Sequence, residues 1–162
     1  MADQKDVIDK LKDTLDRAEQ IKSSWGKVDF QNQPIIAVDA IIEKGLKKYV
    51  LIKRKFPPFK GFWALPGGIV KCGETVEAAL EREVREETGL SVRIVKLVGV
   101  YSGPNRDPRG HVISICYLCE ALGGELKAQS DAEEIRVCDV EEISIIHLAF
   151  DHLKMFKDAN IL

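Results

Sequence analysis

The most informative segment of the chain reads Gly68-Ile69-Val70-Lys71-Cys72-Gly73-Glu74, continues through seven residues, and then reads Arg82-Glu83-Val84-Arg85-Glu86-Glu87-Thr88-Gly89-Leu90. Between Thr75 and Thr88 the apolar residues recur at the spacing of one helix face, and Gly89 follows as a C-terminal stop. A helix is therefore predicted over residues 75–88, with a glycine-rich turn before it.

Three carboxylates on this predicted helix, Glu83, Glu86 and Glu87, stand at i, i+3 and i+4 and so share one face. Like charges this close repel one another, whereas a hard divalent cation would be held by them and would share its oxygen ligands with substrate phosphates. Arg82 lies four residues before Glu86, where it can orient that carboxylate. The simpler interpretation, a solvated acidic helix face, does not explain the turn that precedes the helix.

That turn contains Pro66-Gly67-Gly68 and, five residues later, Gly73 and Glu74. Glycines permit close approach of the backbone, and a carboxylate at a helix entrance favours the exposed N–H groups and the helix dipole. A shaped loop that folds back onto the helix is predicted.

The whole segment resembles the Nudix box, Gly-x5-Glu-x7-Arg-Glu-U-x-Glu-Glu-x-Gly-U with U an aliphatic residue, at every fixed position. Val84 and Leu90 occupy the two U positions. The resemblance extends from about Pro34 to the C-terminus and is to the MutT-like Nudix hydrolases. It implies hydrolysis of a nucleoside diphosphate linked to another moiety, by attack of water on a phosphorus of the pyrophosphate.

Carried over position by position, the resemblance also implies the metal site. Mg²⁺, with Mn²⁺ as the alternative, would be held by Glu83, Glu86, Glu87 and the carbonyl of Gly67. Supporting positions, in the turn and at the two ends of the acidic segment, are Gly68, Glu74, Arg82 and Gly89.

The segment after the box is similar to the ADP-ribose pyrophosphatase branch of the family. Pro104 falls 15 residues after Gly89, and an Arg-Asp-Pro-Arg-Gly-His run follows. This similarity implies cleavage of ADP-ribose to AMP and ribose 5-phosphate. The guanidinium groups of Arg106 and Arg109 in this loop are suited to hold phosphate or ribose oxygens, and Arg54, at the end of the second predicted strand, is a further candidate for a substrate phosphate contact. The alternative for the loop is a solvated turn, in which Asn, Asp, Pro and Gly are expected anyway.

A second acidic segment, Ser130 to Ile135, carries a further catalytic candidate. In ADP-ribose hydrolases of this family a late glutamate outside the box commonly acts as general base or metal ligand, and Glu134 best matches it, with Glu133 next. Two other functions stay open: a MutT-like nucleoside triphosphate pyrophosphatase that cleans the nucleotide pool, and a non-catalytic ADP-ribose-sensing module. The sensing proteins generally add a DNA-binding domain, for which the residues before Pro34 leave no room.

The rest of the chain predicts an α/β (α+β) fold: a Nudix-type α/β/α sandwich around a mixed β-sheet, with an extra N-terminal helix. Residues 3–24 have an amphipathic pattern, so residues 1–30 are predicted as a helical extension that packs on its own domain or forms a homodimer, and residues 34–162 as the Nudix domain. Strands are predicted at 35–42, 49–53, 62–65, 91–102, 111–121 and 135–140, and a final helix at 147–157.

The composition of the chain limits the classes of binding partner that we expect. The chain has 162 residues with 24 basic and 26 acidic side chains, a balance that gives no reason to expect nucleic acid or a membrane surface as a partner beside a small nucleotide substrate. The N-terminal residues lack a signal-peptide pattern, so a cytoplasmic protein is expected. Cys116 and Cys119 form a Cys-x-x-Cys, but side chains three apart on a strand point to opposite faces, so we expect packed, reduced thiols and not a metal site.

Overall fold

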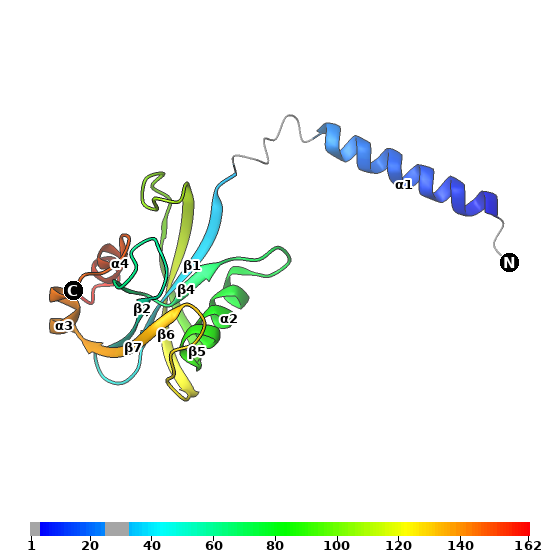
Figure 1. Cartoon of the computed structure of the whole chain (residues 1–162). Coiled ribbons are helices and arrows are strands. Elements are labelled where there is room, and N and C mark those ends of the chain that lie inside the picture. Colours follow the sequence, from blue (N-terminus) through cyan, green and yellow to red (C-terminus); the bar gives the residue numbers. More distant parts are fainter. Residues whose placement is uncertain (1–3, 25–32) are drawn as a thin grey trace. The chain divides into compact units, whose positions relative to one another are not determined.

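The computed structural model describes residues 4–24 and 33–162, and the chain divides into two compact units whose boundary in the sequence falls between Gln33 and Pro34. The first unit contains the helix α1 (Gln4–Ser24). Residues 1–3 and 25–32, which belong to the predicted extension, lie outside the described part. Figure 1 labels the elements, and each unit is considered by itself.

The second unit is a mixed α+β domain, as predicted. Its described residues form seven strands: β1 (Ile35–Glu43), β2 (Lys48–Arg54), β3 (Trp63–Ala64), β4 (Gly67–Ile69), β5 (Leu90–Tyr101), β6 (Val112–Gly124) and β7 (Ala132–Asp139). The helices are α2 (Val76–Thr88), α3 (Val140–Ile145) and α4 (His152–Asp158). None of the helices in the described part is long and apolar enough to cross a membrane.

The sheet is mixed, and two of its strands, β1 and β2, pair at one end only. Its main order is β3-β2-β1-β6-β5, in which β1 and β6 are parallel and the other neighbours antiparallel, while β4 also pairs with β1 and β7 with β2. β1 and β2 pair only at Ile42–Val50 and Glu43–Tyr49. Beyond these pairs β1 bonds to β4 and β2 bonds to β3 and β7, so the two strands separate and leave room between them.

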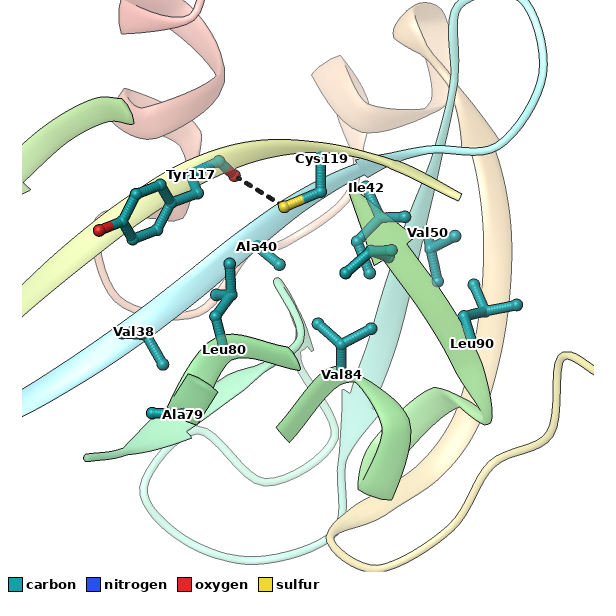
Figure 2. Packing of buried hydrophobic residues seen from close by; sticks show 11 residues of the cluster. Val38, Ala40, Ile42, Val50, Ala79, Leu80, Val84, Leu90, Tyr117 and Cys119 are labelled. Atoms are coloured by element: carbon teal, nitrogen blue, oxygen red, sulfur yellow. Dashed lines mark hydrogen bonds between the residues drawn. The ribbon is translucent and has the colours of Figure 1, made fainter. Parts of the chain in front are cut away.

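Apolar layers cover the two faces of the sheet. On one face α2 packs its buried Leu80 and Val84 against β1 and β6, and Figure 2 shows both side chains directed at the strands. On the other face Ile143 of α3 and Phe156 of α4 pack on β1 and β2. Truncating such a buried Leu or Phe to Ala costs about 2–5 kcal/mol. The predicted α/β/α sandwich is therefore confirmed.

The helix α2 begins and ends where the sequence indicated. Thr75 caps it, because its Oγ1 accepts a hydrogen bond from the N–H of Ala78 at 3.1 Å. Gly89 closes it at φ 73°, and a Cβ there would also lie 2.4 Å from the carbonyl oxygen of Glu125. This glycine is thus required both by backbone conformation and by close packing.

Two local predictions differ from the structure. Gly67–Ile69, expected as loop, forms β4, because its backbone completes the exposed edge of β1. The expected helix 147–157 is replaced by α3 and a shorter α4. A capping box between Asp139 and Glu142 starts α3 early, and Phe150 adopts φ 53°, which ends any helical path before His152.

The two thiols of the Cys-x-x-Cys lie as predicted on opposite faces of β6. Cys116 belongs to the apolar layer under α3 and α4, and Cys119 to the layer under α2, where Figure 2 shows its thiol directed at the carbonyl of Tyr117. Both are free and buried. Burial holds the pKa of both thiols above the ordinary value, so they are packing residues.

Candidate active site

A cavity of about 490 Å³ lies where β1 and β2 separate. Its lining brings together Glu83 and Glu87 of α2, the Gly67–Ile69 turn, Arg54 of β2 and the loop arginines Arg106 and Arg109. Segments that are distant in sequence therefore meet in one space, in which acidic and basic side chains are both present. Such a cavity is of the size used for small-molecule ligands.

Glu87 is the most deeply buried of the three predicted metal ligands, with 6% of its surface exposed. Its Oε2 accepts a hydrogen bond from the N–H of Gly67 at 2.9 Å. Burial raises the pKa of this carboxyl to about 8; the Gly67 hydrogen bond opposes the shift, and the charges of Glu83 and Asp131 add to it. The single hydrogen bond from Gly67 therefore does not offset the cost of burying the charged form of Glu87.

Glu83 lies directly against the glycine turn. A Cβ at Gly68 would come within 2.5 Å of the Glu83 carboxyl carbon and 2.7 Å of both its oxygens. Gly68 thus leaves the space that the carboxylate occupies. Gly67 is tighter still, because a Cβ there would lie 2.1 Å from the carbonyl oxygen of Val38. The close backbone approach expected of this turn is therefore present at both glycines.

Arg82 connects the turn to the acidic face. Its Nη2 and Nε donate to Glu74 at 2.7 and 3.0 Å, and its Nη1 donates to Glu83 at 2.5 Å and to Glu86 at 3.4 Å. The N–H of Lys71 donates to Glu74 as well, and these bonds together lower the pKa of Glu74 to about 2. Arg82 and Glu74 therefore fix the turn to the helix as a permanently ionised pair.

The three carboxylates do not converge on one point. Within the part of the chain that the structure describes, no group of three or more His, Cys, Asp or Glu side chains is arranged to hold a metal ion. The reason is that Arg82 Nη1 contacts both Glu83 and Glu86, while Glu87 is directed at Gly67. The donor chemistry nevertheless fits a hard divalent cation, because every side-chain donor is a carboxylate oxygen and bound positive charge would offset the burial penalty on Glu87.

The three predicted substrate arginines all line the cavity but are not equivalent. Arg106 has only 7% of its side chain exposed and makes a bidentate pair with Asp151, with contacts of 2.5 to 3.2 Å. Arg109 is half-exposed and pairs with the buried Asp107 at 2.7 Å. Arg106 is therefore engaged in holding the 106–109 loop to the start of α4, and Arg109 keeps one face toward the cavity.

Arg54 differs from both, because none of the described carboxylates lies within ion-pair distance of it. Its Nε donates to the carbonyl of Pro58 at 2.7 Å, and its guanidinium stacks on Phe150, 5.0 Å from the ring centre. Burial, followed by the nearby charge of Arg109, lowers its pKa from the ordinary value. Since Arg109 lies on the same ring at 5.7 Å, Phe150 holds two cations together in a position that favours an anionic ligand.

The predicted general base, Glu134, does not line the cavity. It lies on β7, is about half exposed and pairs with Lys53 at 3.4 Å. The acidic residue that this segment brings to the cavity is Asp131, three residues earlier, just before the irregularity in the β2–β7 pairing at Lys53/Arg54. Glu134 therefore stays a prediction, and Asp131 is a second acidic candidate that the sequence did not single out, because the pairing of β7 with β2 cannot be derived from the residues alone.

Asp39 and His152 belong to the cavity but were not among the residues predicted from the sequence. Both line the cavity and both are nearly buried; His152 Nδ1 accepts from the N–H of Leu65 at 2.9 Å, and its Nε2 lies 3.5 Å from Asp39 Oδ1. Burial lowers the pKa of His152. Ser114 Oγ also donates to Asp39. The available signal was a single carboxylate inside the otherwise apolar run of β1.

Comparison with known proteins agrees with this geometry. The family described as NUDIX domain matches residues 33–159. The chain is 58% identical over 125 residues to a protein of Methanocaldococcus jannaschii named ADP-ribose pyrophosphatase. The aligned region covers 77% of this chain and 72% of the relative.

Solved structures are similar as well. A MutT/nudix family protein from Enterococcus faecalis has a TM-score of 0.73 at 29% identity and covers 88% of this chain and 67% of that one. The NUDIX domain of Shewanella oneidensis NrtR, solved in complex with ADP ribose, has a TM-score of 0.75 at 24% identity and shares the fold over 86% of this chain and 96% of that one. Because Gly68, Glu83 and Glu87 of the box line one cavity and the family matches nearly the whole second unit, the chain belongs to the Nudix hydrolase family.

Proposed function

We propose that the chain hydrolyses ADP-ribose to AMP and ribose 5-phosphate. The observation that carries this proposal is a single cavity that places the box carboxylates Glu83 and Glu87 together with Arg54, a guanidinium without a carboxylate partner among the described residues. The similarity to the archaeal ADP-ribose pyrophosphatase supports the choice of substrate. In the reaction water adds to one phosphorus of the pyrophosphate, the bridging P–O bond breaks, and the protons of the water are released as the two monophosphates form.

Nudix hydrolases generally use divalent metal ions. Here we propose Mg²⁺, with Mn²⁺ as the alternative, held by Glu83, Glu86, Glu87 and the carbonyl of Gly67. When bound, the ion would neutralise phosphate charge and make water a better nucleophile. Arg82 would then release its contacts to Glu83 and Glu86 and keep those to Glu74, so the turn would stay fixed while the carboxylates turn to the ion.

The chain's own residues have separate tasks in this proposal. The N–H of Gly67 orients Glu87, and Arg82 with Glu74 holds the turn that presents it. Arg54 and the exposed face of Arg109 bind phosphate or ribose oxygens, and their shared ring, Phe150, limits how far they can move. Asp131 lines the cavity, which supports it beside Glu134 as a candidate for the general base.

Two neighbouring activities are retained as outcomes of one experiment. A hydrolysis screen in Mg²⁺ would compare ADP-ribose with normal and oxidised nucleoside triphosphates. Formation of AMP and ribose 5-phosphate with triphosphates intact is the expected result. Pyrophosphate release from a triphosphate, with ADP-ribose unchanged, would assign the MutT-like activity instead. Binding of ADP-ribose without any hydrolysis would assign the sensing role.

We also propose that the protein is a cytoplasmic homodimer. All four cysteines are free, three of them buried, which suits a reducing compartment. In α1, Ile8, Leu11 and Leu15 follow the three-four spacing of a helix-pairing seam and are exposed together with Val7. Most of the stability of a helix in a protein comes from packing of its apolar face, so a second copy of the chain is the partner we propose for this one. Light scattering that gives the mass of one chain at all concentrations would contradict this.

A further inference from the structure

Three large apolar side chains line the cavity and yet remain exposed to solvent. Ile35, Phe56 and Ile69 are 43%, 50% and 49% exposed, whereas Val38, Ile52 and Leu65, which line the same cavity, are almost completely buried. Apolar surface that gathers at the opening of a polar cavity points to a ligand with an apolar part. The metal and phosphate contacts proposed above involve charged groups, so they give no role to the exposed side chains of Ile35, Phe56 and Ile69.

Along the wall formed by β1 and β4, the lining residues change from acidic to apolar. On β1 the alternating residues Asp39, Ala37 and Ile35 all line it, and on β4 Gly67 pairs with Asp39 and Ile69 with Ala37. This wall therefore runs from the Gly67–Glu87 contact toward Ile35 and Ile69. Four residues of extended strand cover about 13 Å. In a nucleoside diphosphate the base is separated from the phosphates by one ribose, a distance that such a wall accommodates.

The other side of the cavity shows the same order. Arg54 ends β2, and Phe56 follows two residues later in the β2–β3 loop. β1 and β2 are not bonded to each other at this end, so Phe56 and the Ile35–Ile69 pair contribute to one opening from separate parts of the sheet. The ammonium of Lys55 lies 5.4 Å from the centre of the Phe56 ring and covers one face of it. Because Phe56 is still 50% exposed, part of its ring surface stays accessible for stacking.

We propose that Phe56, together with Ile35 and Ile69, forms the binding slot for the planar base of the substrate. This inference rests on the proposed function for the position of the phosphates and extends it by naming the residues that select a nucleotide over a sugar phosphate. Base–aromatic stacking tolerates any base because every base has a π face, so the slot selects the presence of a base more strongly than its identity. Phe56 is thus a specificity residue and takes no part in the bond-breaking step.

The test compares AMP with ribose 5-phosphate, since neither is hydrolysed and only one carries a base. Titration calorimetry in Mg²⁺ buffer would measure both ligands on the full chain and on Phe56→Ala. The expected result is AMP binding weaker by about tenfold, with ribose 5-phosphate unaffected. Leu46→Ala, another exposed apolar truncation in the turn before β2, is the matched control and should change neither affinity.

A second variant tests stacking directly. Phe56→Trp should retain AMP binding and show fluorescence quenching by AMP, in excess of the wild-type signal, with none from ribose 5-phosphate. Two results would contradict the proposed base-binding slot. One is equal AMP affinity in wild type and Phe56→Ala. The other is a fluorescence change on AMP addition that is no larger in Phe56→Trp than in wild type.

The two proposals fail separately. Base binding that depends on Phe56, in a protein that leaves ADP-ribose intact, would remove the proposed function and keep the slot. Hydrolysis of ADP-ribose with KM unchanged by Phe56→Ala would do the reverse.

Discussion

Replacing Glu87 by Gln keeps the shape of the side chain and its acceptor for the Gly67 N–H, but removes a charge that the fold buries. The pKa of this carboxyl is about 8 in the folded chain, compared with 4.5 for an unperturbed glutamate. Between these two pH values the folded state binds more protons than the unfolded state. Without metal, the free energy of unfolding of the wild-type chain therefore decreases as the pH rises from 4.5 to 8.

The magnitude follows from the two pKa values. The destabilisation relative to low pH is about 1 kcal/mol at pH 5 and about 3 kcal/mol at pH 7. Because Gln does not titrate, the stability of Glu87→Gln relative to wild type should rise by about 2.5 kcal/mol between pH 5 and pH 7. Groups that do not interact with Glu87 titrate equally in both proteins and cancel in this difference.

The assay is urea unfolding in EDTA at pH 5, 6 and 7. Glu86→Gln is the control: its carboxylate is 47% exposed, so no comparable burial penalty is expected. A stability difference between wild type and Glu87→Gln that stays constant with pH would refute the burial argument.

Added Mg²⁺ should stabilise wild type more than Glu87→Gln. Both variants should lose orders of magnitude in turnover, and normal turnover in both at saturating Mg²⁺ would remove the metal assignment.

Four further substitutions test other parts of the site. Gly68→Ala would place a methyl group where the Glu83 carboxylate lies, so turnover should fall at least tenfold with a stability loss of about 1–3 kcal/mol; unchanged turnover would show that Glu83 is not positioned by this glycine. Arg109→Ala should raise KM for ADP-ribose more than KM for a triphosphate if it contacts the second ribose, and equal increases would make it a general phosphate contact. Asp131→Asn should lower kcat more than Glu134→Gln, since only Asp131 lines the cavity; the opposite order in kcat and its pH profile would restore Glu134 as the general base.

Much of the site could be predicted because its spacing is local. A helix places residues three and four apart on one face whatever surrounds it, so Glu83, Glu86 and Glu87 followed directly from the 3.6-residue period. The caps of α2 were equally readable, since Thr75 and Gly89 act on backbone groups within a few residues. The opposite placement of Cys116 and Cys119 followed from the two-residue period of a strand.

The remaining features depend on contacts between distant segments. Arg106 looked like a free substrate contact, and only the fold showed that Asp151, 45 residues later, occupies it. Asp131 replaced Glu134 in the cavity because the register of β7 against β2 decides which acid faces inward. The acidic helix face therefore followed from local periodicity, the sandwich from the order of the predicted elements, and the family from the resemblance of the fixed residues to the Nudix box. Which charges are paired, which are buried and where the cavity opens were decided by the tertiary structure, because strand register and long-range ion pairs have no local period to reveal them.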